Sequence, residues 1–331
     1  MARVHPFQTN FTAGELTPKL AGQVDFKKYS NGVETLENMT VFPQGGVSRR
    51  NGSRFVCEVK DSTAITRLIS FEFNITQAYV LEFGNNYIRF LKDNGQITET
   101  AKTISGITAA NPAVVTATSH GYSNGDDVWI AGIVGMTRLN GRRFTVANKT
   151  THTFQLTGED STSYTAWSSG GTASKTYQIT TTYTSAELYD LQFTQSADVM
   201  YIVHPDHPPA KLSRTAHTTW TLADVDFTNG PYLDTNTTAT TISTSAHTVG
   251  TGRTMTASAS TFAATDVGRQ VRFRDGYGVI TAFTSATVVT IQILVDMGST
   301  SSSADWSLGA WSATTGYPRT VSFFEQRLVF G

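Results

Sequence analysis

Polar and apolar residues alternate along three consecutive stretches of the chain, residues 65–73, 77–83 and 86–92. A period of two is the pattern of strands that bury one face. Residues 93–95 follow as Asp-Asn-Gly, a hairpin turn in which Asn-Gly tolerates positive φ angles. These stretches predict an antiparallel meander of about 35 residues, which is the size of a propeller blade or of half a sandwich sheet.

The same order of alternating strand, short polar turn and apolar strand returns at residues 188–203 and 320–330. Without the segments between the copies, each repeat has about 50 residues, which is within reach of propeller blades. We therefore predict a mainly β fold with little helix and an interrupted, propeller-like platform. The platform is expected to comprise residues 61–103, 176–236 and 317–331. Since a propeller needs about four blades or more, we expect it to continue beyond the last residue given.

Small and polar residues with isolated short strands interrupt the platform at residues 104–175. The strands expected there are residues 113–118, 128–131, 143–147 and 153–157. They predict a compact, barrel-like β domain. The segment resembles the small β-domain that is inserted as the first catalytic-cysteine half-domain in ubiquitin-activating enzymes. It contains no cysteine, so the resemblance implies a shared fold without thioester chemistry.

A second interruption is expected at residues 237–316. Its predicted strands, residues 270–274, 279–283 and 287–294, form a meander whose layout echoes the first insert. Residues 299–303 are Ser and Thr only, a composition that is typical of a flexible loop. We therefore predict a second small β-barrel or meander domain.

Residues 29–56 hold the most specific local pattern in the chain. Apolar residues recur at near-helical spacing within residues 33–39. The Phe-Pro-Gln-Gly-Gly sequence at residues 42–46 then ends any helix, because proline lacks the N–H and glycine permits a tight turn. We expect another tight turn at the Asn-Gly of residues 51–52 and the start of a strand at residues 55–56. The first 28 residues are expected to form an N-terminal arm, and residues 1–60 together an arm and anchor segment.

Five short motifs in this region carry a family resemblance. They are Asn-Phe-Thr-Ala-Gly-Glu-Leu at 10–16, Tyr-Ser-Asn-Gly-Val-Glu at 29–34, Glu-Asn at 37–38, Pro-Gln-Gly-Gly at 43–46 and Arg-Arg-Asn-Gly at 49–52. Their order and spacing resemble the N-terminal signature of the podovirus tail nozzle family, also called the tail tubular protein B family. The resemblance covers residues 8–60 well and the β repeats less closely.

That resemblance implies a structural virion protein of a short-tailed phage or prophage. Its members form a homohexameric ring beneath the portal–adaptor (head–tail connector) complex, and a propeller-rich body encloses the DNA exit channel. The implied partners are other copies of the chain, the adaptor ring, possible tail fibres, and DNA that passes without sequence-specific binding. The implied locations are the virion and, during synthesis, the host bacterial cytoplasm. The residues expected at the assembly interface are Phe42, Pro43, Gln44, Gly45, Gly46, Arg49 and Arg50.

Composition is compatible with such a conduit. The net charge is −1 and only 15% of residues are charged, so no global field attracts nucleic acid or anionic membrane. The single cysteine, Cys57, excludes an internal disulfide framework. No apolar run of 18 residues is present, so we expect no membrane-spanning segment, and the first six residues lack the apolar core of a secretion signal.

Two clusters of possible metal ligands lie in predicted connections. His204, Asp206 and His207 place two imidazoles and a carboxylate within four residues, but neighbouring prolines favour an exposed connector over a metal site. The Asn-Gly-Asp-Asp of residues 124–127 is oxygen-rich, but it lacks the alternating ligands of an EF-hand loop, so we interpret it as a turn. The sequence predicts neither a cofactor nor a metal.

The sequence does not predict catalysis either. Asp25, Glu34 and Glu37 could be imagined as an acid/base set for glycoside cleavage, but nothing sets their separation, so we interpret them as solvated. Cys57 has no nearby histidine and is expected to be a buried, inert thiol. No phosphate-binding glycine loop, Gly-x-Ser-x-Gly elbow or His-Glu-x-x-His motif occurs.

The arginines and tryptophans leave alternatives open. Arg49 and Arg50 could dock on an acidic neighbouring ring, touch DNA phosphates, or pair locally to stabilise the turn. The tryptophans could be sugar-stacking platforms or core and interface residues; they are Trp129, Trp167, Trp220, Trp306 and Trp311. A glycan-binding, adhesin-like tail module is therefore the alternative to the tail nozzle, and a tail-associated glycan hydrolase is a third hypothesis.

Overall fold

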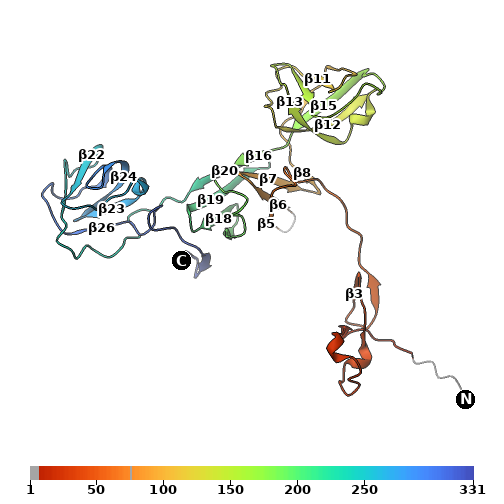
Figure 1. The fold of residues 1–331 in the computed structure, drawn as a ribbon, viewed down its shortest axis with the longest axis horizontal. Coiled ribbons are helices and arrows are strands. Elements are labelled where there is room, and N and C mark those ends of the chain that lie inside the picture. Colours follow the sequence, from red (N-terminus) through yellow and green to blue (C-terminus); the bar gives the residue numbers. More distant parts are fainter. Residues whose placement is uncertain (1–6, 75–76) are drawn as a thin grey trace, which may run out of the picture. The chain divides into compact units, whose positions relative to one another are not determined.

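The computed structural model describes residues 7–74 and 77–331, and the chain divides into two compact units, Met1–Val56 and Cys57–Gly331. Strands dominate the described residues (Figure 1). Their helical segments are single 3₁₀ turns, namely η1 (Pro18–Leu20), η2 (Tyr29–Asn31), η3 (Thr137–Leu139) and η4 (Ala264–Asp266). The prediction of a mainly β chain with little helix is confirmed.

The N-terminal unit holds two short strand pairs. β1 (Gly14–Glu15) runs parallel to β2 (Gly32–Val33), and β3 (Met39–Val41) is antiparallel to β4 (Val47–Arg49). The near-helical spacing within residues 33–39 is therefore misleading. Asn38 has a positive φ of 55°, which interrupts any helix, and Met39 begins a strand. Residues 55–56 start no strand, and Phe55 is 81% exposed.

Two four-stranded antiparallel meanders lie within residues 61–103 and 176–236, where the platform was expected. The first has the order β5-β6-β7-β16, with β8 (Gly95–Gln96) also paired to β7, and the second has the order β17-β18-β19-β20. The strands of the first are β5 (Arg67–Asn74), β6 (Gln77–Gly84), β7 (Tyr87–Lys92) and β16 (Gln178–Thr180). Those of the second are β17 (Gln192–Ser196), β18 (Val199–His204), β19 (His207–Ala216) and β20 (Thr219–Asp224). The first insert thus enters between the third and fourth strands of a sheet.

The two meanders share one core, because apolar side chains from both lie in a single buried cluster. Trp220 of β20 stacks on Phe90 of β7 with ring centroids 4.3 Å apart. The hairpin of β27 (Val321–Phe324) and β28 (Arg327–Phe330) is a separate two-stranded sheet. It contacts the second meander through Phe323, which lies edge-on to Tyr201 at 6.1 Å. Each of the three predicted repeats thus contains an antiparallel hairpin, β5-β6, β17-β18 and β27-β28.

The sequence placed the second meander imperfectly. Residues 188–190 form a turn instead of a strand, and Leu188 and Leu191 are buried there as packing residues. The strand begins only at Gln192 and extends through the expected turn. Both β19 and β20 were missed. Two prolines near the start of β19 argue against a strand, and the alternation that marks β20, Thr-Trp-Thr-Leu, is only four residues long.

The first insert is a seven-stranded antiparallel sheet with the order β10-β11-β14-β13-β12-β15-β9. Its strands are β9 (Lys102–Thr103), β10 (Gly106–Ile107), β11 (Val114–Thr116), β12 (Asp127–Val134), β13 (Arg142–Ala147), β14 (Thr153–Leu156) and β15 (Ser169–Lys175). The chain joins both sheet edges directly: Ile104 donates its N–H to Gly171 O (2.9 Å), and Ser105 donates to Thr116 O (2.9 Å). The sheet therefore curls around one apolar core, as a barrel-like domain must.

The second insert is a six-stranded antiparallel sheet with the order β21-β22-β25-β24-β23-β26. Its strands are β21 (Ile242–Thr244), β22 (Gly250–Ala257), β23 (Gln270–Phe273), β24 (Gly276–Ser285), β25 (Val288–Val295) and β26 (Trp306–Leu308). Ile242 and Ser303 exchange two backbone hydrogen bonds, which closes the sheet on itself. A separate apolar core fills it.

Candidate functional site

The N-terminal unit brings together motifs that lie more than thirty residues apart in the sequence. Phe11 donates its N–H to the carbonyl oxygen of Gly45 at 2.8 Å. Gly45 has a φ of +102°, which favours glycine, and it is the one buried residue in the described part of this unit. A side chain at that position would meet Asn10 at 3.3 Å. The Asn-Phe motif and the Pro-Gln-Gly-Gly turn therefore form one contact.

The remaining motif residues are joined in the same unit. Glu15 accepts a hydrogen bond from the N–H of Leu36 at 2.8 Å. Gly32 lies against Leu16, whose side chain occupies the space that a Cβ would need, at 2.4 Å. Glycine at this position therefore makes room for the parallel pairing of β1 and β2.

The two arginines differ. Arg50 donates from Nε to Asn38 Oδ1 at 2.7 Å, and its N–H donates to the Asn38 carbonyl at 3.0 Å, so its side chain is engaged in local pairing. Arg49 is exposed and makes no hydrogen bond or ion pair with the described residues. Of the two, Arg49 is the guanidinium that remains available to a partner.

Apolar side chains of this unit face solvent. Phe7 is 88% exposed, Val24 81% and Phe42 45%, and no large apolar side chain is buried within residues 7–56. The interface residues expected from the sequence occupy the loop between β3 and β4, apart from Arg49 and Arg50, which end that hairpin. Exposed apolar side chains that form a contiguous patch can mark an interaction surface, so Phe7, Val24 and Phe42 are the candidate contact residues of this unit.

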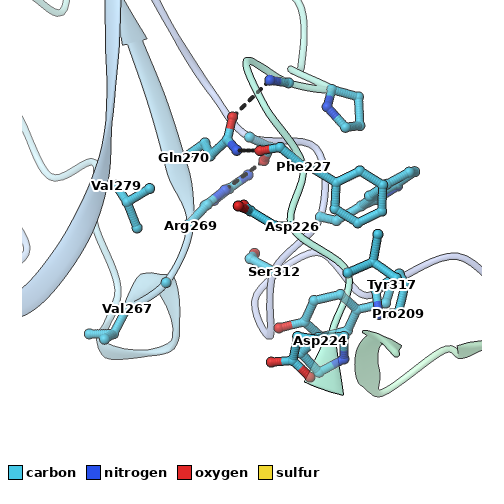
Figure 2. A pocket seen from close by; sticks show the side chains of 17 residues that line it. Pro209, Asp224, Asp226, Phe227, Val267, Arg269, Gln270, Val279, Ser312 and Tyr317 are labelled. Atoms are coloured by element: carbon cyan, nitrogen blue, oxygen red, sulfur yellow. Dashed lines mark hydrogen bonds between the residues drawn. The ribbon is translucent and has the colours of Figure 1, made fainter. Parts of the chain in front are cut away.

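A second candidate site is a cavity of about 510 Å³ beside the second insert (Figure 2). Aromatic rings of Phe227, Trp311 and Tyr317 and the carboxylates of Asp224 and Asp226 line it. Burial, and then the charge of Asp224, raises the pKa of Tyr317, so its hydroxyl stays protonated. Rings beside carboxylates are groups that stack on and hydrogen-bond to a sugar.

The wall of this cavity is held by buried polar contacts. Figure 2 shows Gln270 reaching to the connector, where it donates to Phe227 O and accepts from the N–H of Gly230 at 2.7 Å. Arg269 donates from Nε to Gly309 O at 2.7 Å and pairs with Asp266 at 2.8 Å. These contacts hold the two connectors of the second insert together.

The structure corrects the prediction for the pair His204 and His207. His204 was expected in an exposed connector, but it is 2% exposed, at the end of β18. It faces His207 with ring centroids 5.1 Å apart, and His207 Nε2 lies 3.3 Å from Glu187 Oε2. Burial, and then the neighbouring imidazole, lowers the pKa of His204. Only Asp206 is exposed, because β18 and β19 join through a two-residue turn that the sequence reading missed.

The oxygen-rich turn before β12 is satisfied by the protein itself. Asp127 pairs with Arg89, which is 2% exposed, at 2.5 Å, and Asn124 accepts from the N–H of Lys149 at 3.0 Å. Asp126 accepts from the N–H of Ser123 at 2.8 Å. Its oxygens are thus already used, which agrees with the interpretation as a turn.

The remaining residues considered for catalysis, Cys57 and three carboxylates, differ in their exposure. Cys57 is half-buried, and not fully buried as expected; burial, and then Glu82, raises the pKa of its thiol. Asp25, Glu34 and Glu37 are all exposed. Within residues 7–74 and 77–331, no three His, Cys, Asp or Glu side chains are grouped so as to hold a metal ion.

The tryptophans mostly pack. Trp220 is 5% exposed in the core shared by the meanders, while Trp167 and Trp306 pack against the cores of the first and second inserts. Trp129 is 36% exposed beneath the guanidinium of Arg143. Trp311, beside the cavity, is therefore the tryptophan placed best to meet a ligand.

Comparison with known proteins found a similarity for one part of the chain. Residues 110–176 match the family model of the Ubiquitin-activating enzyme E1 FCCH domain, which supports the resemblance of the first insert to that domain. The match spans well under half of the chain. No curated protein matches the chain. No helix among the described residues has the length and apolar character needed to cross a bilayer.

Proposed function

We propose that this chain is a structural subunit of a short-tailed phage tail, a nozzle or tubular protein that forms a homohexameric ring around the DNA exit channel and docks under the portal–adaptor complex. The role is mechanical and involves no catalysis or cofactor. DNA passes through the ring without sequence-specific binding, and tail fibres are a further possible partner. The protein is made in the bacterial cytoplasm and resides in the virion.

The observation that carries this proposal is the N-terminal unit. Its family-like motifs contact one another, so they specify one local structure, and its apolar side chains have no core of their own. A unit of this kind needs a partner to shield Phe7, Phe42 and Phe55 from water.

Charge supports a second copy of the chain as that partner. Residues 1–56 hold seven of the 25 Lys and Arg residues but only four of the 26 Asp and Glu residues, a net charge of +3 against −4 for the remainder. Opposite charges on two parts of a chain favour contact between copies. We infer that the loop between β3 and β4, with Arg49 beside it, lies in this contact.

The test is the native mass of the full chain, together with negative-stain images of the same sample. A six-fold ring with a central hole is expected. Phe42→Asp should abolish the ring, whereas the matched control Val249→Asp, at a 62% exposed position of the second insert, should leave it intact. A monomer at all concentrations, with residues 1–56 folded, would refute assembly through this unit.

The cavity beside the second insert favours one alternative, a glycan-binding tail module. Trp311 and Tyr317 offer ring surfaces, and Asp224 and Asp226 offer carboxylates, within one cavity. Saturable binding of a surface polysaccharide that is lost in Trp311→Ala and kept in Trp129→Ala would favour the alternative. Binding unaffected by Trp311→Ala would exclude this cavity as its site.

A further inference from the structure

The two inserts have the same strand order. When the strands are counted from β10 in the first insert and from β21 in the second, both sheets read 1-2-5-4-3-6, and every neighbouring pair is antiparallel. The order is not a simple meander, since strand 5 lies between strands 2 and 4. The first sheet has one more strand, β9, at its edge, and the other six strands agree with the second sheet. Two unrelated sheets would rarely agree in both order and direction over six strands.

The strand registers also agree. The pair Thr116 and Thr153 in the first insert has the place of Thr256 and Val288 in the second. Pairing of strands 4 and 5 gives the same correspondence independently. The equivalent segments, first insert before second, are 97–99 and 231–233, 105–108 and 242–245, 114–117 and 254–257, 123–130 and 266–273, 143–146 and 277–280, 152–156 and 287–291, and 173–177 and 306–310.

Hydrogen bonds outside the regular ladders repeat at these equivalent positions. In the first insert, five backbone N–H groups donate to carbonyl oxygens as follows: Thr108 to Val114 (3.0 Å), Ala117 to His152 (2.8 Å), Gly125 to Val146 (2.9 Å), Val146 to Asp126 (2.8 Å) and Asp126 to Ser123 (3.1 Å). In the second insert, the equivalent bonds in the same order are Ser245 to Thr254 (2.8 Å), Ala257 to Thr287 (2.8 Å), Gly268 to Ile280 (2.8 Å), Ile280 to Arg269 (2.9 Å) and Arg269 to Asp266 (2.9 Å). One side-chain bond repeats as well: Val114 N–H donates to Thr108 Oγ1, and Thr254 N–H donates to Ser245 Oγ.

The same positions build both cores. The equivalent buried pairs are Val115 and Met255, Ala117 and Ala257, Val128 and Val271, Ile130 and Phe273, Val146 and Ile280, Phe154 and Val289, and Leu156 and Ile291. Gly125 and Gly268 precede the third strand with φ angles of +88° and +90°. Both therefore need glycine's freedom at the same turn.

The connectors agree too. Glu99 donates its N–H to Lys175 O at 2.8 Å, as Leu233 does to Leu308 O at 2.9 Å. Tyr177 donates to Ile97 O, and Ala310 to Pro231 O, both at 2.9 Å. At the first residue of strand 3, Asp127 reaches Arg89 of β7, while its counterpart Gln270 bonds the connector at Phe227 and Gly230.

We infer that residues 231–310 are a second copy of the domain formed by residues 97–177, the domain whose residues 110–176 match the FCCH family model. Each copy is anchored through the residue that begins its third strand, Asp127 to Arg89 of the first meander and Gln270 to the connector at Phe227 and Gly230. The chain thus carries this domain twice. Neither statement depends on a role in a phage tail, so the proposed function and this inference can fail separately.

The first experiment tests the predicted register in the full-length chain with Cys57→Ser, so that no native thiol interferes. The variants are Thr116→Cys/Thr153→Cys and its counterpart Thr256→Cys/Val288→Cys. Each pair lies next to a hydrogen-bonded pair, Ala117 with His152 or Ala257 with Thr287. Both are therefore non-hydrogen-bonded pairs, in which the Cα atoms are about 4.5 Å apart. That spacing lies within the range that a disulfide spans. Both pairs should close under mild oxidation, as peptide mass mapping would show.

The matched controls are shifted by two residues along strand 5. Thr116→Cys/Gln155→Cys and Thr256→Cys/Thr290→Cys place the sulfurs on the same face but out of register, and they should remain largely reduced. If the second-insert pair stays reduced while the first closes, or if the shifted pair closes preferentially, the second insert is not a copy.

The second experiment tests the anchors by hydrogen exchange. Asp127→Ala should speed exchange at Glu99 and Tyr177 about tenfold, and Gln270→Ala should do so at Leu233 and Ala310, while strands 2 and 5 of each copy keep their protection. Asp93→Ala, whose side chain is 79% exposed, is the control and should change neither. Unchanged exchange at the connectors would remove the anchor role.

Discussion

The buried ion pair of the second insert allows a quantitative prediction. Asp266 and Arg269 have side chains that are 2% and 3% exposed, and their charged atoms lie 2.8 Å apart. Asp266 also accepts hydrogen bonds from the N–H of Ala263 at 2.8 Å and from Thr314 Oγ1 at 2.6 Å. Both charges are therefore cut off from water and compensated only by the protein.

Removal of one partner should cost much more than removal of both. Asp266→Asn leaves the Arg269 guanidinium buried without a counter-charge, a change that costs about 3–5 kcal/mol in comparable sites. Arg269→Met leaves the carboxylate with its two other donors, so we expect a smaller loss of about 2–3 kcal/mol. The double variant, Asp266→Asn/Arg269→Met, should recover to within about 1–2 kcal/mol of the native chain, since neither charge is then left buried without its partner.

The assay is urea dependence of hydrogen exchange in peptides from residues 231–310, and in peptides from residues 97–177 for the control, which isolates each domain from the rest of a multi-domain chain. The matched control is Asp126→Asn in the first insert, at the position equivalent to Arg269. Asp126 lies 3.7 Å from Lys175 in a partly exposed pair, and we expect a loss of under about 1 kcal/mol. If both single variants lose less than that control, or if the double variant is the least stable, the pair is not desolvated and the reasoning fails.

Three further predictions concern packing and pH. Gly276→Ala should cost about 1–3 kcal/mol, because its Cβ would meet main-chain oxygens of the neighbouring strand at 2.4 Å, whereas Gly46→Ala, which opens into free space, should be nearly neutral in thermal unfolding. Trp220→Ala should cost about 3–5 kcal/mol by removing the stack between the meanders, and Trp129→Ala, at a surface position, under about 1 kcal/mol. Burial, and then the adjacent imidazole, lowers the pKa of His204 below its ordinary 6.5, so on acidification the imidazole is protonated in the unfolded chain before it is protonated in the folded chain. The contribution of His204 to stability is therefore complete above about pH 6.5 and is lost as the pH falls through the lowered pKa. His204→Gln should flatten this pH dependence of the free energy of unfolding, as measured by urea titration.

Alternation of polar and apolar residues was sufficient to predict strands wherever one face of the strand is buried and the other is exposed to solvent. Residues 77–83 and 86–92 were placed to within a residue as β6 and β7 because Tyr79, Leu81 and Phe83 point into the shared core. The hairpin after β7 was also expected, although its two positive φ angles belong to Asp93 and Asn94 and not to the Asn-Gly pair.

The failures have a physical pattern. β19 buries Pro209, Ala210, Leu212 and Arg214, a mixture of residue types that local sequence does not mark as one buried face, and β20 buries only Trp220. His204 looked like part of an exposed connector because proline follows it, yet a two-residue turn returns the chain and buries its ring. In residues 33–39 the apolar spacing was accidental, and a positive φ at Asn38 decided the outcome.

The similarity of the two inserts shows why their relationship is faint in sequence. At equivalent core positions the side chains differ in shape, such as Ile130 against Phe273 and Phe154 against Val289, while they remain apolar. Loops differ in length, since strands 3 and 4 are joined by residues 135–141 in the first insert and by residues 274–275 in the second. Backbone hydrogen bonds are insensitive to both changes, so the pattern of donors and acceptors persists after the residue identities have gone.

Repetition and the missing core together bear on the proposed function. The meanders share one buried apolar core, and each insert has a core of its own. The N-terminal unit is the exception, because its backbone is ordered by motif contacts while its large side chains remain exposed. Ordering a segment costs conformational entropy that burial normally offsets. The burial must therefore come from a surface outside residues 7–56, and the excess of positive charge in this unit favours an acidic one. That requirement, and not the fold of the β domains, is the ground on which we propose assembly with further copies of the chain.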